Sequence, residues 1–415
     1  MSKYIIKGGK KLGGSVRISG SKNAALPIIA GTILNRGIST LYNVPDIHDT
    51  QMMYEILKKL GATVVKTKNK VVIDTRKINN YEIPHDLMRQ MRSSVIIAGS
   101  LIGRYKKCIF SYPGGCDIGA RPIDLHLKGF EKLGINVDKN YGNIECDCEN
   151  IFAEKIDLEF PSVGATENII LASVMAKGKT VITNAAKEPE IVDLQKFLNK
   201  MGANIEGAGT DMIEIVGVEK LKNVSYNIMP DRIEAGTFLC VAAITGANLT
   251  LEEVEPSHIT PIIHKLEEMG CKIEAFKRKI NIKGPKKLKA VDIKTMPYPG
   301  FPTDMQSVLA ATLTVAKGTS IIVENIFENR FRYTQELVTM GAKINIEGKS
   351  AVIRGVRKLY GAKVSATDLR GGAALILVGL IAKGETIIDN NQYILRGYNK
   401  IDEKLRAIGA NIYEE

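Results

Sequence analysis

The chain has 415 residues, a formal net charge of +12 and no tryptophan, and 45% of its residues are hydrophobic. This is ordinary globular composition for two or three domains, and the longest apolar run, Gly371 to Ala382, is too short to cross a bilayer. The start "MSKYIIKGG" has no apolar signal core, and the six cysteines form no CxxC pair. We therefore expect reduced thiols, no metal and a cytoplasmic protein.

The positive charge leaves several partners open. It suits nucleic acid, anionic lipid or phosphorylated small molecules, and it also suits simple solubility. Lysines are spread along the chain, and the dense patches "KGGKK" and "KGPKKLKA" lack interleaved aromatic residues. This pattern weakens the nucleic-acid interpretation.

A short phrase recurs six times along the chain at near-constant spacing. The copies are "KKLGATV", "EKLGINV", "NKMGANI", "EEMGCKI", "VTMGAKI" and "RAIGANI". Each closes an amphipathic helix with a glycine where a left-handed C-terminal cap belongs. A β-branched strand precedes the helix, and short strands and a second, apolar helix follow it.

Six such units predict an α/β fold with three units in each of two domains. The period is longer than that of solenoid repeats, which favours closed domains over an open array. We place the boundary near "YNIMPDRIEAG". The N-terminal strands have no helix of their own and complete the last unit, so residues 22–229 form one domain and residues 1–21 with 230–415 the other.

The first helix, following "SGSKNAALP", begins at Ser21 or Asn23 as its cap and places Lys22 beside free backbone N–H groups. Such a helix start binds anions, although an ordinary capped helix explains the pattern too. Further on, Arg89 and Arg92 in "MRQMRSS" open an apolar helix. Arginines there oppose the helix dipole, so they either pair with carboxylates or await an anionic ligand.

The next feature is the glycine-rich segment "SYPGGCDIGARPIDLH", which holds Cys116 and Arg121 and is expected to be a mobile loop. A nearby cation lowers the pKa of a thiol, and a bound anion raises it again. Such a thiol can transfer a proton or act as a nucleophile. The alternative is an incidental exposed cysteine.

Later segments add a carboxylate and three arginines. Asp304 in "PGFPTDMQS" stands at a helix start, either as a cap or as a catalytic base. Arg330, Arg370 and Arg396 lie in turn sequences and could build a pocket for a highly charged anion. No P-loop, GxGxxG, HExxH or GxSxG occurs, which argues against metal, nucleotide-driven and triad chemistry.

Together these segments resemble the enolpyruvyl transferase family over the whole chain. The resemblance is close to the branch of the family that acts on UDP-N-acetylglucosamine. The segments "SGSKNAALPI", "PGGCDIGARPIDLH", "PSVGATENI", "NAAKEPEIVDL", "MPDRIEAGTF", "FPTDMQ", "ENRF", "ATDLR" and "RGY" occur in order. The resemblance implies two inside-out α/β barrel domains of three repeated β-α-β-α-β-β units, with the active site in the cleft between them.

It also implies transfer of enolpyruvate from phosphoenolpyruvate to the 3′-hydroxyl of UDP-N-acetylglucosamine, in peptidoglycan synthesis and without a cofactor. By resemblance, Cys116 on a closing lid protonates C3 and is the thiol alkylated by fosfomycin, and Asp304 takes the hydroxyl proton. Lys22, Arg121 and Arg396 face the phosphate, and Arg330 and Arg370 face the carboxylate. Asn23 lies in the same motif as Lys22 and is an implied substrate-binding residue. The implied sugar-nucleotide contacts are Arg92, Arg121, Pro122, Ile123, Asp124, Leu125, Ser162, Val163, Gly164 and Ile326.

One departure concerns the nucleotide. Some members carry a basic residue two places before the serine of "SVG", where this chain has Phe160. The alternatives are 5-enolpyruvylshikimate-3-phosphate synthase, which shares the repeat but not the "GGC" segment, and a basic nucleic-acid-binding repeat protein. The preferred interpretation expects two small-molecule substrates and neither nucleic acid nor membrane as partner.

Overall fold

The computed structural model describes residues 2–114, 118–119, 122–140 and 142–415, and these residues form two compact units. The terminal unit contains residues 2–19, 118–119 and 230–415. The middle unit contains residues 20–114, 122–140 and 142–229. Cys116 and Arg121, which the predicted lid carries, lie outside the described residues.

The middle unit combines helices with three sheets of described strands, ordered β13-β3-β5-β4, β6-β8-β7 and β11-β12-β10-β9. Its helices are α1 (Lys22–Gly31), α2 (His48–Leu60), α3 (His85–Gln90), α4 (Ile96–Tyr105), α5 (Asp124–Lys132), α6 (Val163–Ser173) and α7 (Pro189–Lys200), with 3₁₀ turns η1 (Thr32–Leu34) and η2 (Arg92–Val95). Its strands are β3 (Ile38–Tyr42), β4 (Thr63–Lys66), β5 (Lys70–Asp74), β6 (Lys107–Ser111), β7 (Asn136–Asn140), β8 (Asn143–Asp147), β9 (Lys155–Asp157), β10 (Lys179–Thr183), β11 (Asn204–Glu206), β12 (Met212–Val216) and β13 (Val224–Asn227).

The terminal unit has the same kind of architecture, with described sheets ordered β21-β22-β1-β23, β15-β16-β14-β2 and β17-β18-β20-β19. Its helices are α8 (Arg232–Thr245), α9 (Thr260–Glu268), α10 (Gln306–Leu313), α11 (Thr334–Thr339), α12 (Leu369–Ile381), α13 (Gln392–Leu395) and α14 (Ile401–Ala407), with 3₁₀ turns η3 (Pro256–Ile259) and η4 (Thr303–Met305). Its strands are β1 (Tyr4–Lys7), β2 (Gly13–Arg17), β14 (Asn248–Glu252), β15 (Lys272–Phe276), β16 (Lys279–Lys283), β17 (Ile293–Lys294), β18 (Thr319–Val323), β19 (Lys343–Glu347), β20 (Ser350–Arg354), β21 (Lys363–Ser365), β22 (Glu385–Asp389) and β23 (Asn411–Glu414).

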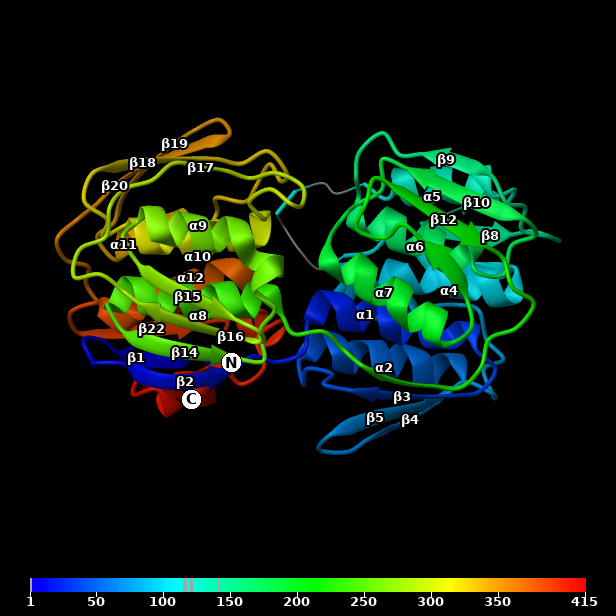
Figure 1. Ribbon diagram of the computed structural model, residues 1–415, viewed down its shortest axis with the longest axis horizontal. Coiled ribbons are helices and arrows are strands. Elements are labelled where there is room, and N and C mark those ends of the chain that lie inside the picture. Colours follow the sequence, from blue (N-terminus) through cyan, green and yellow to red (C-terminus); the bar gives the residue numbers. More distant parts are fainter. Residues whose placement is uncertain (1, 115–117, 120–121, 141) are drawn as a thin grey trace. The chain divides into compact units, whose positions relative to one another are not determined.

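Within each unit the apolar inner helices, such as α4 and α12, lie between the sheets, as Figure 1 shows. The sequence explains this order, because the inner helices are apolar on every side. Helix α4 reads "IIAGSLIGRY" and α12 reads "LRGGAALILVGLI", and both are buried along most of their length. A helix without a polar face must be covered all round. The strands bury alternate residues and expose the others, as a sheet with one solvated face does.

The structure confirms the predicted α/β class, in which helices are enclosed by sheets. One repeat runs β14, α9, the hairpin β15–β16, β17 and α10, and the next runs β18, α11, the hairpin β19–β20, β21 and α12. The described strands form separate sheets rather than one continuous closed sheet. The word barrel therefore fits only loosely, because each sheet belongs to one repeat.

The six repeat glycines have the predicted left-handed conformation. Their φ angles lie between 78° and 107°, a region that costs glycine little and strains other residues. Each glycine ends an outer helix and lets the chain turn into the following strand. These glycines are Gly61, Gly134, Gly202, Gly270, Gly341 and Gly409.

Both ends of the described chain belong to the terminal unit. Strand β1 lies between β22 and β23 and pairs antiparallel with both. Tyr4 and Ile6 are fully buried in that unit's core, and the middle unit has a core of its own. In the part of the chain that the structure describes, no helix has both the length and the apolar character needed to cross a membrane.

Candidate functional site

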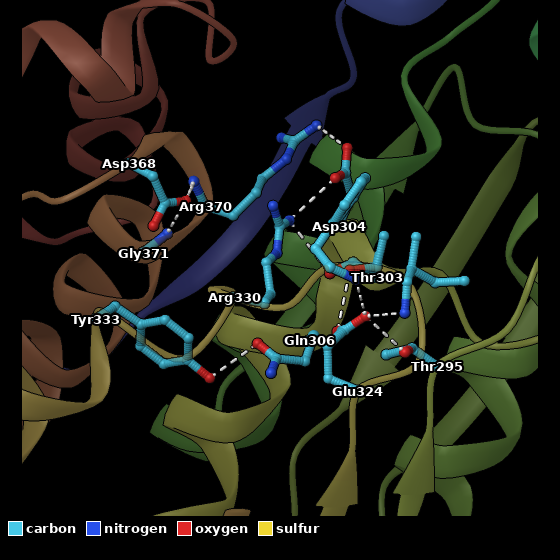
Figure 2. Close-up of polar contacts among 12 residues, drawn as sticks. Thr295, Thr303, Asp304, Gln306, Glu324, Arg330, Tyr333, Asp368, Arg370 and Gly371 are labelled. Atoms are coloured by element: carbon cyan, nitrogen blue, oxygen red, sulfur yellow. Dashed lines mark hydrogen bonds and ion pairs between the residues drawn. The ribbon is translucent and has the colours of Figure 1, made fainter. Parts of the chain in front are cut away.

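Asp304 lies between two arginines in the terminal unit, as Figure 2 shows. Its Oδ1 is 3.0 Å from Nη2 of Arg330, and its Oδ2 is 2.9 Å from Nη2 of Arg370. Arg330 follows β18 in the chain, and Arg370 stands in the first turn of α12. The structure therefore brings together three predicted site residues that the sequence separates widely.

The two arginines are buried, and their positive charge exceeds that of one carboxylate. Their side chains are each 3% exposed, against 29% for Asp304. Burial lowers the pKa of Arg370, but its interactions with Asp304, Tyr398 and Asp231 together outweigh burial, and the pKa is raised. Nε of Arg330, with Nε and Nη1 of Arg370, makes no hydrogen bond within the described residues. Buried donors of this kind suit a second anion.

The surroundings of Arg370 hold it in place. Asp368 caps α12 by accepting hydrogen bonds from the backbone N–H groups of Arg370, at 2.9 Å, and Gly371, at 3.0 Å. The guanidinium carbon of Arg370 lies 5.3 Å from the ring centre of Tyr398. A side chain on Gly371 would meet Tyr333 at 2.8 Å. The glycine thus lets Tyr333 approach this helix start.

Asp304 does not cap helix α10. The residue before the turn η4 is Pro302, and no side chain caps that turn. The capping explanation for Asp304 is therefore wrong for this structure, because its carboxylate turns toward the two arginines instead (Figure 2).

Lys22 occupies the predicted helix start in the middle unit. Ser21 is the cap of α1, since its Oγ accepts a hydrogen bond from the N–H of Ala24 at 3.3 Å. Nζ of Lys22 forms a salt bridge of 2.7 Å with Asp49, which is 1% exposed. Asp49 was missed in the sequence, where it reads as an ordinary acidic residue in the first turn of α2. Asn23 is partly exposed beside them.

The predicted nucleotide segment begins α6. Ser162 caps this helix through a 3.4 Å hydrogen bond from the N–H of Ala165, and Val163 and Gly164 form its first turn. His126 lies against this turn, because a side chain on Gly164 would meet its ring at 3.1 Å. Asn168 Nδ2 is 2.8 Å from Nδ1 of His126 and fixes the ring. Sequence reasoning missed both residues.

The interpretation of "MRQMRSS" needs correction. Arg89 lies in the last turn of α3, not at a helix start. The helix begins directly after Pro84, so Arg89 falls near its end. A cation in the last turn of a helix is favoured by the helix dipole. Arg92 opens η2, directly before α4, and is partly exposed.

The other predicted residues are placed as follows. Asp124 is the first residue of α5, Ile123 before it is buried, Leu125 is partly exposed and Pro122 is exposed. Ile326 lies in the turn between β18 and Arg330. Arg396 directly follows α13 and is partly exposed. No group of three or more potential metal ligands occurs among the described residues.

Comparisons with known proteins agree with this picture. The family model described as EPSP synthase (3-phosphoshikimate 1-carboxyvinyltransferase) matches residues 6–405. UDP-N-acetylglucosamine 1-carboxyvinyltransferase 2 of Caldanaerobacter subterraneus subsp. tengcongensis is 52% identical over 99% of each chain. The protein of the same name from Clostridium tetani is 50% identical over 100% of each chain.

Solved structures show the same fold at lower identity. The enolpyruvyl transferase NikO from Streptomyces tendae has a TM-score of 0.89 at 24% identity, over 100% of this chain and 98% of its own. An EPSP synthase from Acinetobacter baumannii has a TM-score of 0.79 at 19% identity, over 100% of both chains. These likenesses extend over both units.

Proposed function

This chain belongs to the enolpyruvyl transferase family, and from that premise we propose that it is a UDP-N-acetylglucosamine 1-carboxyvinyltransferase. It transfers the enolpyruvyl group of phosphoenolpyruvate to the 3′-hydroxyl of UDP-N-acetylglucosamine and releases phosphate, which commits the sugar to peptidoglycan. The observation that carries the proposal is about 50% identity over the whole chain to relatives of that name.

The proposed chemistry is an addition followed by an elimination. The sugar 3′-oxygen bonds to C2 of phosphoenolpyruvate while Cys116 gives a proton to C3, and Asp304 takes the hydroxyl proton. The tetrahedral ketal then loses phosphate from C2 and a proton from C3, which restores the double bond. Proton transfer by placed side chains of this kind typically contributes about 10²–10⁴-fold in rate.

The arginine pair suggests how binding of phosphoenolpyruvate would free the catalytic base. While Asp304 is paired with Arg330 and Arg370, its charge is neutralised and it is a poor base. The carboxylate of phosphoenolpyruvate would bind the N–H groups of the two arginines that have no hydrogen-bond partner. From there it would compete with Asp304 for the positive charge of the arginines and release Asp304. The base would then form only when its substrate is present.

The remaining roles follow the family pattern. Lys22, Arg121 and Arg396 bind the phosphate, while the residues before α5, the start of α6 and Ile326 bind the sugar nucleotide. These residues come from both proposed domains, residues 22–229 and residues 1–21 with 230–415. Both substrates carry several negative charges and cross membranes poorly, so we assign the activity to the cytoplasm, without nucleic acid or membrane as partner.

A phosphate-release assay tests the activity. Phosphoenolpyruvate should yield phosphate only when UDP-N-acetylglucosamine is present, and shikimate 3-phosphate should not replace it. Release with shikimate 3-phosphate alone would instead support the synthase after which the matched family model is named. Tight duplex binding with a steep salt dependence, without phosphate release, would favour the nucleic-acid alternative.

A further inference from the structure

We propose that Glu324 is a positioning residue that fixes both the catalytic Asp304 turn and the loop carrying Ile326. The inference rests on the proposed function, which makes Asp304 the base and Ile326 a sugar-nucleotide contact. Glu324 follows β18 directly and is 3% exposed. Neither the family resemblance nor the sequence pattern drew attention to it.

One oxygen of Glu324 organises the loop that follows it. Oε1 accepts hydrogen bonds from the backbone N–H of Ile326 at 2.8 Å and that of Phe327 at 3.2 Å. It also accepts one from Oγ1 of Thr295 at 2.9 Å. Thr295 is itself bound to Asn325 through the backbone N–H and the side-chain amide of that residue. This arm thus holds residues 325–327 against β17 and its continuation.

The other oxygen reaches the turn η4. Oε2 accepts a hydrogen bond of 3.0 Å from Oγ1 of Thr303, the residue next to Asp304 (Figure 2). The carbonyl oxygen of Thr303 in turn accepts a 3.2 Å hydrogen bond from Nη2 of Arg330, the group that also binds Asp304. One buried carboxylate therefore ties the base, its arginine partner and the Ile326 loop into one network.

A purely structural carboxylate would affect stability alone, and the two arms allow a sharper test. Thr303→Val keeps the side-chain shape and removes only the hydrogen bond from Thr303 to Oε2 of Glu324. We expect kcat to fall about tenfold, since a hydrogen bond to a charged group is commonly worth that much. KM for UDP-N-acetylglucosamine should stay within about twofold, because the Ile326 arm remains.

Glu324→Ala removes both arms. It should lower kcat at least as far as Thr303→Val does and also raise KM for the sugar nucleotide about tenfold. In the double variant, the kcat loss should equal that of Glu324→Ala alone, because both changes break the same contact to Thr303. Independent, multiplying losses would contradict the link through Thr303.

Glu324→Gln is the conservative variant. Its carbonyl oxygen can replace Oε1, and its amide can donate to the Thr303 hydroxyl, which also accepts hydrogen bonds. We therefore expect kcat and KM to recover to within about threefold of the parent. The matched control is Glu336→Ala in α11, which removes a carboxylate that accepts a 3.0 Å hydrogen bond from the N–H of Ser365. That variant should keep parental kcat and KM.

Amide hydrogen exchange supplies a readout that needs no activity. In Glu324→Ala the amides of Ile326 and Phe327 should exchange about tenfold faster or more, and in Glu324→Gln they should not. Failure of the parent to release phosphate would reject the proposed activity, while the exchange data would still decide whether Glu324 holds the loop. Parental exchange in Glu324→Ala, or parental kcat and KM in folded Glu324→Ala and Thr303→Val, would overturn the inference.

Discussion

At the scale of single residues, local sequence rules predicted helix caps but not the direction in which a candidate side chain points. Asp304 stood at a helix start, where a cap and a catalytic base are equally well predicted. The pairing with Arg330 and Arg370 excludes the cap, and it joins three separate segments of the chain. Spacing along the sequence carries no information about such long-range contacts. Lys22 and its cap Ser21 were predictable because a helix start is a local feature.

Asp304→Ala should reduce turnover about 10²–10⁴-fold, as loss of a general base does. Binding of UDP-N-acetylglucosamine, measured by calorimetry, should change little by comparison. The two buried arginines also lose their counter-charge, so added inorganic phosphate should raise the melting temperature of the variant more than that of the parent. Near-parental turnover in the folded fraction, with reduced stability alone, would show that Asp304 is only a structural partner of the arginines.

Cys116 should be the thiol that reacts first in the native protein. Burial raises the pKa of Cys240 to about 12 and that of Cys271 to about 12, and it also raises the pKa of Cys108. Thiols of this kind hold little thiolate at neutral pH and resist alkylation. Fosfomycin should therefore add once per chain, at Cys116, as peptide mass spectrometry would show.

The same cysteine should act as an acid rather than as a required nucleophile. Cys116→Asp should then retain substantial phosphate release with a lower pH optimum, since an ordinary aspartate titrates near ~3.9. It should also resist fosfomycin, and Cys116→Ser should be nearly inactive because a hydroxyl is a weak acid. A folded Cys116→Asp protein that binds the sugar nucleotide without turnover would instead favour a covalent thiol adduct.

At the scale of elements, the repeat was predictable because each unit obeys local rules. Gly61 and its five equivalents cap helices in the left-handed region, as the recurring phrase indicated. The apolar second helix of each unit was also recognisable. Arg89 was misplaced because the short helix after Pro84 has no strong apolar pattern of its own. Nothing in the sequence indicated the contact of Asp193 in α7 with Tyr226 in β13 and with Met229, because Asp193 has the pattern of a solvated residue on a helix face.

Asp193 should make stability depend on pH in an unusual direction. Burial raises its pKa from the ordinary 3.8 to about 6, although Tyr226 and the N–H of Met229 bond to it. Between these values the folded state holds a proton that the unfolded state has released, so stability falls as pH rises from about 4 to about 6. Asp193→Asn should remove that fall, which linkage puts at about 2–3 kcal/mol.

The contrast is Asp157→Asn. Its exposed carboxylate bonds to the hydroxyl of Thr183, which lowers its pKa. Its small stabilising effect is present above the unfolded pKa and is lost as pH falls, so its replacement should act in the opposite direction. Urea unfolding of both variants at pH 4 and pH 6 measures the difference. A parallel pH profile for Asp193→Asn and the parent would refute the assignment.

At the scale of the whole molecule, the chain builds two cores that use distant parts of the sequence differently. The described core residues of the middle unit all come from one middle stretch of the chain. The core of the terminal unit instead combines Tyr4 and Ile6 from the N-terminus with Ile388 and Ile412 near the C-terminus. From the sequence we expected both N-terminal strands to complete the last repeat. Strand β1 does so, whereas β2 pairs with β14 in an earlier repeat. Strand β1 lies between β22 and β23, so one sheet joins the two ends of the chain.

Separate cores predict separable stabilities. Ile6→Ala empties a fully buried site in β1, next to Gly379 of α12, and should cost about 2–5 kcal/mol. Native-state hydrogen exchange should then rise in α12 and β22 while α4 and α6 keep their protection. The matched variant Ile73→Ala, fully buried in β5, should do the reverse. Because each cavity weakens only the core that lines it, equal losses of protection in all four helices and strands would show that the two cores unfold as one cooperative body.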